Sequence, residues 1–90
     1  MLQELARKAE LLGITFRVHS TSPLTTQLAM VLYSAMRQMP ELTRFMTGVD
    51  MYSYGMAIHL ERLGTILITQ RGRRYYFSPE GDYLLTTNMI

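Results

Sequence analysis

Residues 41–85 decide the fold, and they read ELTRFMTGVDMYSYGMAIHLERLGTILITQRGRRYYFSPEGDYLL. Glycines divide this stretch into shorter segments. Because glycine ends helices readily, Gly48 and Gly64 predict the ends of two helices. The predicted order is therefore a helix over 40–47, a turn, a helix over 51–63, and two strands joined by a basic turn.

Two residues mark where these predicted helices begin. Pro40 excludes continuation of a preceding helix and suits the first turn of the next one. Asp50 is the candidate N-cap of the helix over 51–63, because a short carboxylate can accept hydrogen bonds from the first free backbone N–H groups.

The helix predicted over 51–63 can be placed in two registers. Counting back from Gly64 puts Ser53, Ala57, Leu60 and Leu63 in the core, whereas counting forward from Gly48 points to Tyr54 and Ile58. The first is preferred, because Met56, Leu60 and Leu63 then cluster on one side. Its outward face consists of Met51, Tyr54, Gly55, Ile58, His59 and Arg62, with Tyr52 and Glu61 at the edges.

The end of the stretch predicts a β-hairpin. Residues 65–69 are short and β-branched, as is typical of a strand. Residues 71–74 form a turn centred on glycine, and residues 75–77 return as the second strand. Ser78 followed by Pro79 is a helix-start signal, so we expect a closing helix from Pro79 to about Thr86.

The first half of the chain predicts two helices and one strand. Leucine and alanine recur at helical spacing over residues 2–12, and residues 23–39 carry a second apolar face. Between them, residues 14–18 alternate apolar and polar side chains, which indicates a strand. We expect residues 1–22 to be an N-terminal extension of a compact unit over 23–90.

Composition limits the classes of site. The chain has 90 residues, is 48% apolar, and contains no cysteine. Disulfides and thiolate metal sites are therefore excluded. With only His19 and His59, a metal site would need carboxylates from several elements, and no spacing suggests one. Neither a metal nor a cofactor is expected.

Charge and hydropathy bear on partners. The formal charge is +2, and Lys8 is the only lysine among nine basic residues. Arginine forms bidentate contacts with phosphate and guanine, so this bias permits nucleic-acid binding. No apolar run is long enough to span a membrane, and charges occur too early for a signal peptide. We expect a soluble cytoplasmic protein with no membrane partner.

Three segments resemble a known superfamily. Residues 41–50 resemble the first helix and turn of a bacterial helix-turn-helix, and residues 60–66 resemble a recognition helix entering a wing strand. Residues 72–85 are similar to the wing and following helix of MarR- and PadR-like regulators. The resemblance implies an α+β, mainly α fold, a winged helix-turn-helix to which an N-terminal helix and short strand are added.

The resemblance also implies a partner and a site. Winged helices place the second helix in the major groove of double-stranded DNA and the wing on the backbone. Carried over by position, the recognition-helix residues are Met51, Tyr52, Tyr54, Gly55, Ile58, His59 and Arg62. The wing residues are Arg71, Gly72, Arg73 and Arg74. Base readers are usually polar, and the apolar members of this face suit a protein partner as well.

Two functions follow from this sequence. The first is a small DNA-binding transcriptional regulator, a repressor or accessory factor that acts by occupying a duplex site as a homodimer. The helix over residues 2–12 is either the dimerisation arm or part of the core. The alternative is a protein-interaction module on the same fold, an inhibitor or adaptor of the kind a phage or plasmid encodes. An enzyme is not expected, because no nucleophile, base and stabiliser group together in the pattern.

Overall fold

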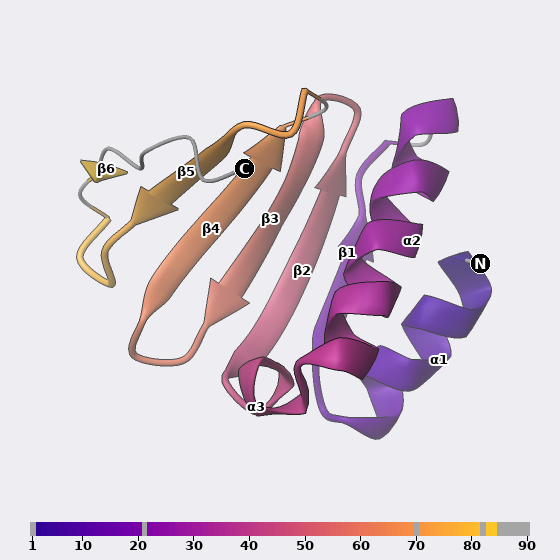
Figure 1. Cartoon of the computed structure of the whole chain (residues 1–90), viewed down its shortest axis with the longest axis horizontal. Coiled ribbons are helices and arrows are strands. Elements are labelled where there is room, and N and C mark those ends of the chain that lie inside the picture. Colours follow the sequence, from indigo (N-terminus) through magenta and orange to yellow (C-terminus); the bar gives the residue numbers. More distant parts are fainter. Residues whose placement is uncertain (1, 21, 70, 82, 85–90) are drawn as a thin grey trace.

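Six strands form one mixed sheet whose spatial order follows the chain, β1 to β6 (Figure 1). The computed structural model describes residues 2–20, 22–69, 71–81 and 83–84. The elements are α1 (Leu2–Leu11), β1 (Thr15–Val18), α2 (Pro23–Gln38), α3 (Pro40–Thr43), β2 (Met46–Tyr52), β3 (Gly55–Leu60), β4 (Gly64–Thr69), β5 (Arg74–Phe77) and β6 (Tyr83–Leu84).

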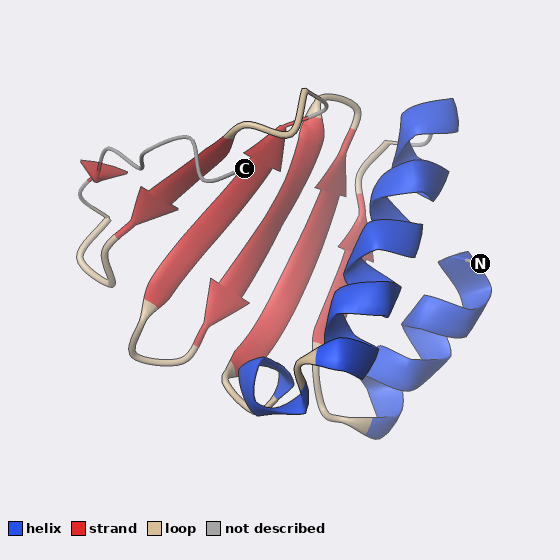
Figure 2. Cartoon of the chain, viewed as in Figure 1, coloured by secondary structure: helices blue, strands red, loops and turns tan. Residues whose placement is uncertain are grey.

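The sheet combines one parallel pair with an antiparallel meander. β1 pairs in parallel with β2, with Phe16 opposite Val49, and α2 makes the crossover between them. Each later strand pairs antiparallel with its neighbour in the chain. In Figure 2 the helices gather at the β1 end, and β4 to β6 extend away from them.

Alternation along the central strands gives the sheet two different faces. Val49 and Met51 of β2 lie opposite Ile58 and Met56 of β3, and all four side chains are buried in one core with residues of α1 and α2. The intervening positions point the other way, because successive strand residues alternate faces. No described helix packs on that second face, which we call the uncovered face.

The expected mainly α, winged helix-turn-helix fold is wrong. The segment expected as a helix over 51–63 instead completes β2, turns at residues 53–54, forms β3 and ends in the turn before β4. The alternation of buried residues at Val49 and Met51 favours a strand over a helix, because those side chains fill the core beneath α2. Asp50 is accordingly a strand residue and not a helix N-cap.

Gly48 also lies within β2, where helix termination was expected. A Cβ at this position would lie 3.3 Å from the Thr15 carbonyl oxygen of β1 and 3.5 Å from Cδ2 of His59. Glycine therefore allows the close approach of the β1 backbone to β2 at this position, and it does not end a helix in the left-handed conformation.

Two further helix predictions fail. The helix expected over 40–47 ends at Thr43, because Met46 enters the sheet opposite Leu60. The closing helix expected from Pro79 is replaced by a turn and by β6, which pairs with β5. The final part of that prediction, about Thr86, lies outside the described residues.

The remaining elements confirm the sequence predictions. The helices over 2–12 and 23–39 are α1 and α2, and the strands over 14–18, 65–69 and 75–77 are β1, β4 and β5. The backbone N–H of Ser22 donates to Thr25 Oγ1 at 3.0 Å at the start of α2. β1 joins the sheet beside β2. None of the described helices is long and apolar enough to cross a membrane.

A glycine substitution tests the packing of β4 against the chain after β5. Gly64 has φ +107, and a Cβ there would collide with the Phe77 carbonyl oxygen. We expect Gly64→Ala to lower the free energy of unfolding by about 2–4 kcal/mol, from left-handed strain plus overpacking.

The control is Gly72→Ala, because Gly72 has φ +78 but open space around it. It should cost only the backbone term of about 1 kcal/mol. Urea denaturation of both variants measures the difference. Equal losses would contradict the close approach at Gly64.

Candidate functional site

Asp50 is a charged residue buried at the centre of the sheet. It lies in the middle of β2 and its side chain points to the uncovered face, away from its neighbours Val49 and Met51. Only 4% of the residue is exposed to solvent. Because burying an unpaired carboxylate is costly, its partners determine whether the sheet tolerates it.

Arg17 of β1 is the first partner. It lies in register with Asp50, donating from Nε to Oδ1 at 2.6 Å and from Nη2 to Oδ2 at 2.9 Å. The Arg17 hydrogen bonds are the main reason that the pKa of Asp50 falls well below its usual range, and burial opposes them. The same contact raises the pKa of Arg17. The pair is therefore charged on both sides.

Two imidazoles complete the shell around the carboxylate. His19 Nε2 lies 2.6 Å from Oδ1, and His59 Nε2 lies 2.6 Å from Oδ2. An ionised carboxylate only accepts hydrogen bonds, so both Nε2 atoms carry hydrogen. Each neutral ring then has its lone pair on Nδ1. We call Arg17, His19, Asp50 and His59 the Asp50 cluster.

Gly48 lies beside the groups that converge on Asp50. His59 lies opposite Gly48 in the register of β2 and β3, and so reaches Asp50 diagonally. A Cβ on Gly48 would lie 3.5 Å from Cδ2 of His59 and 3.8 Å from Nη2 of Arg17. Both are ordinary contact distances, so His59 and Arg17 pack beside Gly48, and the tight approach at this position is that of the Thr15 carbonyl oxygen of β1.

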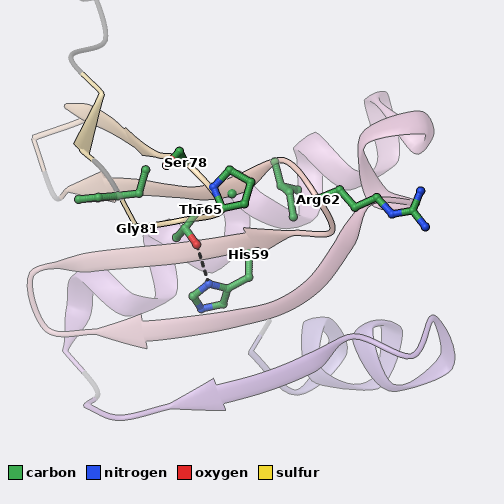
Figure 3. A pocket seen from close by; sticks show the side chains of 9 residues that line it. His59, Arg62, Thr65, Ser78 and Gly81 are labelled. Atoms are coloured by element: carbon green, nitrogen blue, oxygen red, sulfur yellow. Dashed lines mark hydrogen bonds between the residues drawn. The ribbon is translucent and has the colours of Figure 1, made fainter.

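The two imidazoles differ in the contacts that their Nδ1 atoms make. His59 Nδ1 lies 3.0 Å from Oγ1 of Thr65, its register partner on β4 (Figure 3). In the neutral ring Nδ1 accepts, so the Thr65 hydroxyl donates to it. Among the described residues, none hydrogen-bonds His19 Nδ1, and 44% of that side chain is exposed. His19 is thus the imidazole whose basic nitrogen is open to a ligand.

An aromatic stack continues from His19. The His19 and Tyr52 rings are stacked with centroids 4.7 Å apart, and Tyr52 stacks on Tyr54 at 5.2 Å. Burial is the main cause that raises the pKa of Tyr52, followed by the charge of Asp50. Tyr54 is 52% exposed, so the stack ends in an aromatic ring that is open to solvent.

A pocket of about 530 Å³ lies on the other side of His59. Figure 3 shows the Thr65 hydroxyl directed at His59 and the Arg62 guanidinium directed away from the pocket. Its lining consists of His59, Leu60, Arg62, Gly64, Thr65, Phe77, Ser78, Pro79 and Gly81. We call it the Thr65 pocket.

The structure divides the expected recognition surface between both faces of the sheet. Met51 and Ile58 are buried in the core beneath the helices, not outward. Gly55 is also buried, at the start of β3. Tyr52, Tyr54 and His59 belong to the aromatic stack and the Asp50 cluster, and Arg62 lies in the β3–β4 turn with φ +64.

The expected wing residues keep their hairpin. Arg71, Gly72, Arg73 and Arg74 are exposed between β4 and β5, or at the start of β5. That hairpin confirms the strand–turn–strand prediction, although no recognition helix precedes it. Contact of these arginines with DNA stays a prediction.

Sequence reasoning missed Arg17, Asp50 and Thr65 as site residues, and it treated His19 only as one of two histidines. The available signal was the spacing of Arg17 and His19, which puts both on one face of a strand. Their partners lay in a segment expected to be helical. In a helix, Asp50 and His59 would not have faced a neighbouring strand.

No protein-family model, curated protein or solved structure matches this chain. Within the described part of the chain, no group of three histidine, aspartate or glutamate side chains is arranged to hold a metal ion.

The buried carboxylate predicts a pH-dependent contribution to stability. We expect Asp50→Asn to lower the free energy of unfolding at neutral pH by about 2 kcal/mol, the scale of hydrogen bonds to a charged group. Because folding lowers the pKa of Asp50, its contribution is present above the unfolded-state value of about 4 and is lost as pH falls below that value.

Urea denaturation of both proteins from neutral pH to about pH 2 measures this contribution. The difference between wild type and Asp50→Asn should shrink on acidification. A difference that stays constant or grows would show that ionised Asp50 does not stabilise the fold.

Proposed function

We propose that the uncovered face binds RNA and cleaves a phosphodiester by general base catalysis. The observation that carries this proposal is a single buried carboxylate that orients two imidazoles and one guanidinium side by side. Imidazole is the side chain suited to proton transfer near neutral pH. A carboxylate on its Nε2 fixes the tautomer and leaves Nδ1 to act on a substrate.

The charge of the cluster suits an anionic substrate. Arg17 balances Asp50, so the cluster is neutral when both imidazoles are neutral and becomes positive when either takes up a proton. The Arg17 side chain is half exposed. Its planar donors can contact phosphate oxygens while Nε and Nη2 hold Asp50.

The source of the attacking nucleophile favours RNA as the substrate. Thr65 is the only hydroxyl residue that the structure shows bonded to either imidazole. No hydroxyl of the described residues is hydrogen-bonded to His19, whose side-chain partner is Asp50. RNA provides its own nucleophile, the 2′-hydroxyl next to each phosphodiester. A base beside an arginine is then sufficient to begin the reaction.

Every bond and proton in the cleavage of RNA is accounted for by these groups and water. His19 Nδ1 takes the proton of the 2′-hydroxyl, and the 2′-oxygen forms a bond to phosphorus. The bond from phosphorus to the 5′-oxygen breaks, and that oxygen takes a proton from water. The hydroxide that remains is neutralised by the proton that His19 releases. His59 transfers no proton in this reaction; its Nε2–H donates to Asp50 from the β3 side and helps to hold the carboxylate that orients His19. The products are a 2′,3′-cyclic phosphate and a 5′-hydroxyl.

A second candidate rests on the chain of contacts from Thr65 through His59 to Asp50. Nucleophile, base and carboxylate stand in this order in hydrolases that form covalent intermediates, and the Thr65 pocket could hold an ester. Thr65→Ser keeps a hydroxyl, whereas Thr65→Val removes it. Complete loss of esterase activity in Thr65→Val alone would favour this candidate.

Double-stranded DNA binding, homodimerisation and a protein partner remain proposals. The exposed arginines at 71–74 support contact with nucleic-acid phosphates, whether or not the strand is cleaved. DNA lacks the 2′-hydroxyl, so a DNA-binding role would use this hairpin without the proposed cleavage. A regulator and a ribonuclease therefore differ in their requirement for His19.

We expect the wild-type chain to cleave a fluorescent single-stranded RNA, with cleavage retained in EDTA. His19→Ala should lower kcat by about 10²–10⁴-fold, the usual contribution of a base, and His59→Ala should have a smaller effect, because His59 acts through Asp50. Arg37→Ala, an exposed position on α2, is the matched control and should keep the wild-type rate. Gel analysis of product ends measures both rate and chemistry.

The same RNA with 2′-deoxy sugar at every position should bind but resist cleavage. Cleavage of that strand, or a wild-type rate in His19→Ala, would contradict the proposed reaction.

A further inference from the structure

We infer that Tyr54 and the arginine turn between β4 and β5 form a track for single-stranded nucleic acid that leads to the Asp50 cluster. This inference rests on the proposed function and adds a subsite to it. Tyr54 would receive a nucleobase of a nucleotide next to the cleaved one. Arg71 and Arg73 would contact the phosphates that follow.

The first observation is the direction of the aromatic stack. His19, Tyr52 and Tyr54 lie nearly parallel, with 7° and 10° between successive ring planes. Tyr54 is therefore two ring layers away from the proposed base. A nucleobase added to its exposed side extends the same stack and belongs to a neighbouring nucleotide, not to the one that reacts.

The second observation is independent and concerns the sheet register. Tyr52 pairs with Gly55 at the β2–β3 turn, and Gly55 pairs with Thr69 at the end of β4. The two turns therefore lie at one end of the sheet, side by side in Figure 1. The backbone N–H of His19 donates to the Met51 carbonyl at 2.9 Å, which brings His19 to the same end.

This end of the sheet combines the two groups that bind single strands. Bases stack on aromatic side chains in a sequence-tolerant way, while basic side chains follow the backbone. Tyr54, Arg71 and Arg73 are all exposed. A single strand is favoured over a duplex, because duplex bases are already stacked on each other and cannot lie on Tyr54.

The alternative is that the stack only orders the β2–β3 turn. Both alternatives allow Tyr54 to affect stability. They differ in substrate length, because an outer subsite is filled by a tetranucleotide but not by a dinucleotide. The ratio of kcat/KM for these two RNAs therefore reports the subsite separately from folding and from the chemical step.

The experiment measures that ratio in the full chain. We expect Tyr54→Leu to lower the tetranucleotide-to-dinucleotide ratio by roughly five- to hundredfold, the effect of losing one stacked base. Tyr54→Phe should restore the ratio, since it keeps the ring. Phe45→Leu is the matched control, because Phe45 is 47% exposed but precedes β2 at the opposite end of the sheet.

Arg73→Ala tests the second part of the track. It should weaken binding of a 2′-deoxy tetranucleotide and reduce the dependence of log Kd on log salt by about one unit. Arg37→Ala, on the helical side, should change neither quantity. An unchanged salt slope in Arg73→Ala would overturn the phosphate contact.

The outcomes separate this inference from the proposed function. Cleavage by wild type with an unchanged ratio in Tyr54→Leu, or an equal fall in Phe45→Leu, overturns the track alone. Absence of cleavage together with Tyr54-dependent binding of the deoxy strand overturns the catalytic proposal and supports the track. Absence of both cleavage and binding overturns both.

Discussion

The burial of one carboxylate constrains the rest of this structure. Asp50 is 4% exposed, and it accepts two hydrogen bonds from Arg17 and one from each imidazole of His19 and His59. These partners come from the strands on either side, so the charge fixes the position of β1 beside β2 and of β3 on the other flank. Removing one partner would leave a buried charge uncompensated, which costs more than the contact contributes.

The physical basis for function is the same shell of contacts. Because Asp50 binds both Nε2 atoms, the basic Nδ1 atoms of the two rings face away from the carboxylate. Nδ1 of His59 is bonded to Thr65, and the His19 side chain is 44% exposed. The helices cover the opposite face and leave this one open to a substrate. A neutral cluster that becomes cationic on protonation suits an anionic ligand, and the aromatic stack and arginine turn at one end of the sheet suit a single-stranded chain.

Local patterns predicted the elements that carry their own signal, but not the sheet they join. The apolar faces of residues 2–12 and 23–39 and the β-branched run at 65–69 gave correct elements. The predictions for residues 46–60 were wrong, because glycines and an acidic residue also occur at the ends of helices. The alternation of Val49 and Met51 indicates a strand only when α2 is known to pack on those side chains. The Asp50 cluster could not be predicted from the sequence for the same reason, because Arg17 and Asp50 are 33 residues apart and meet only through strand pairing.

The most direct test of the central claim is the tautomeric state of the two histidines, measured by long-range proton–nitrogen NMR at a pH where both rings are neutral. The account predicts that His19 and His59 both carry hydrogen on Nε2, and that Asp50→Asn weakens this preference. Nδ1–H tautomers in the wild type, or rings that exchange freely between tautomers, would show that Asp50 does not orient the imidazoles and would contradict the account.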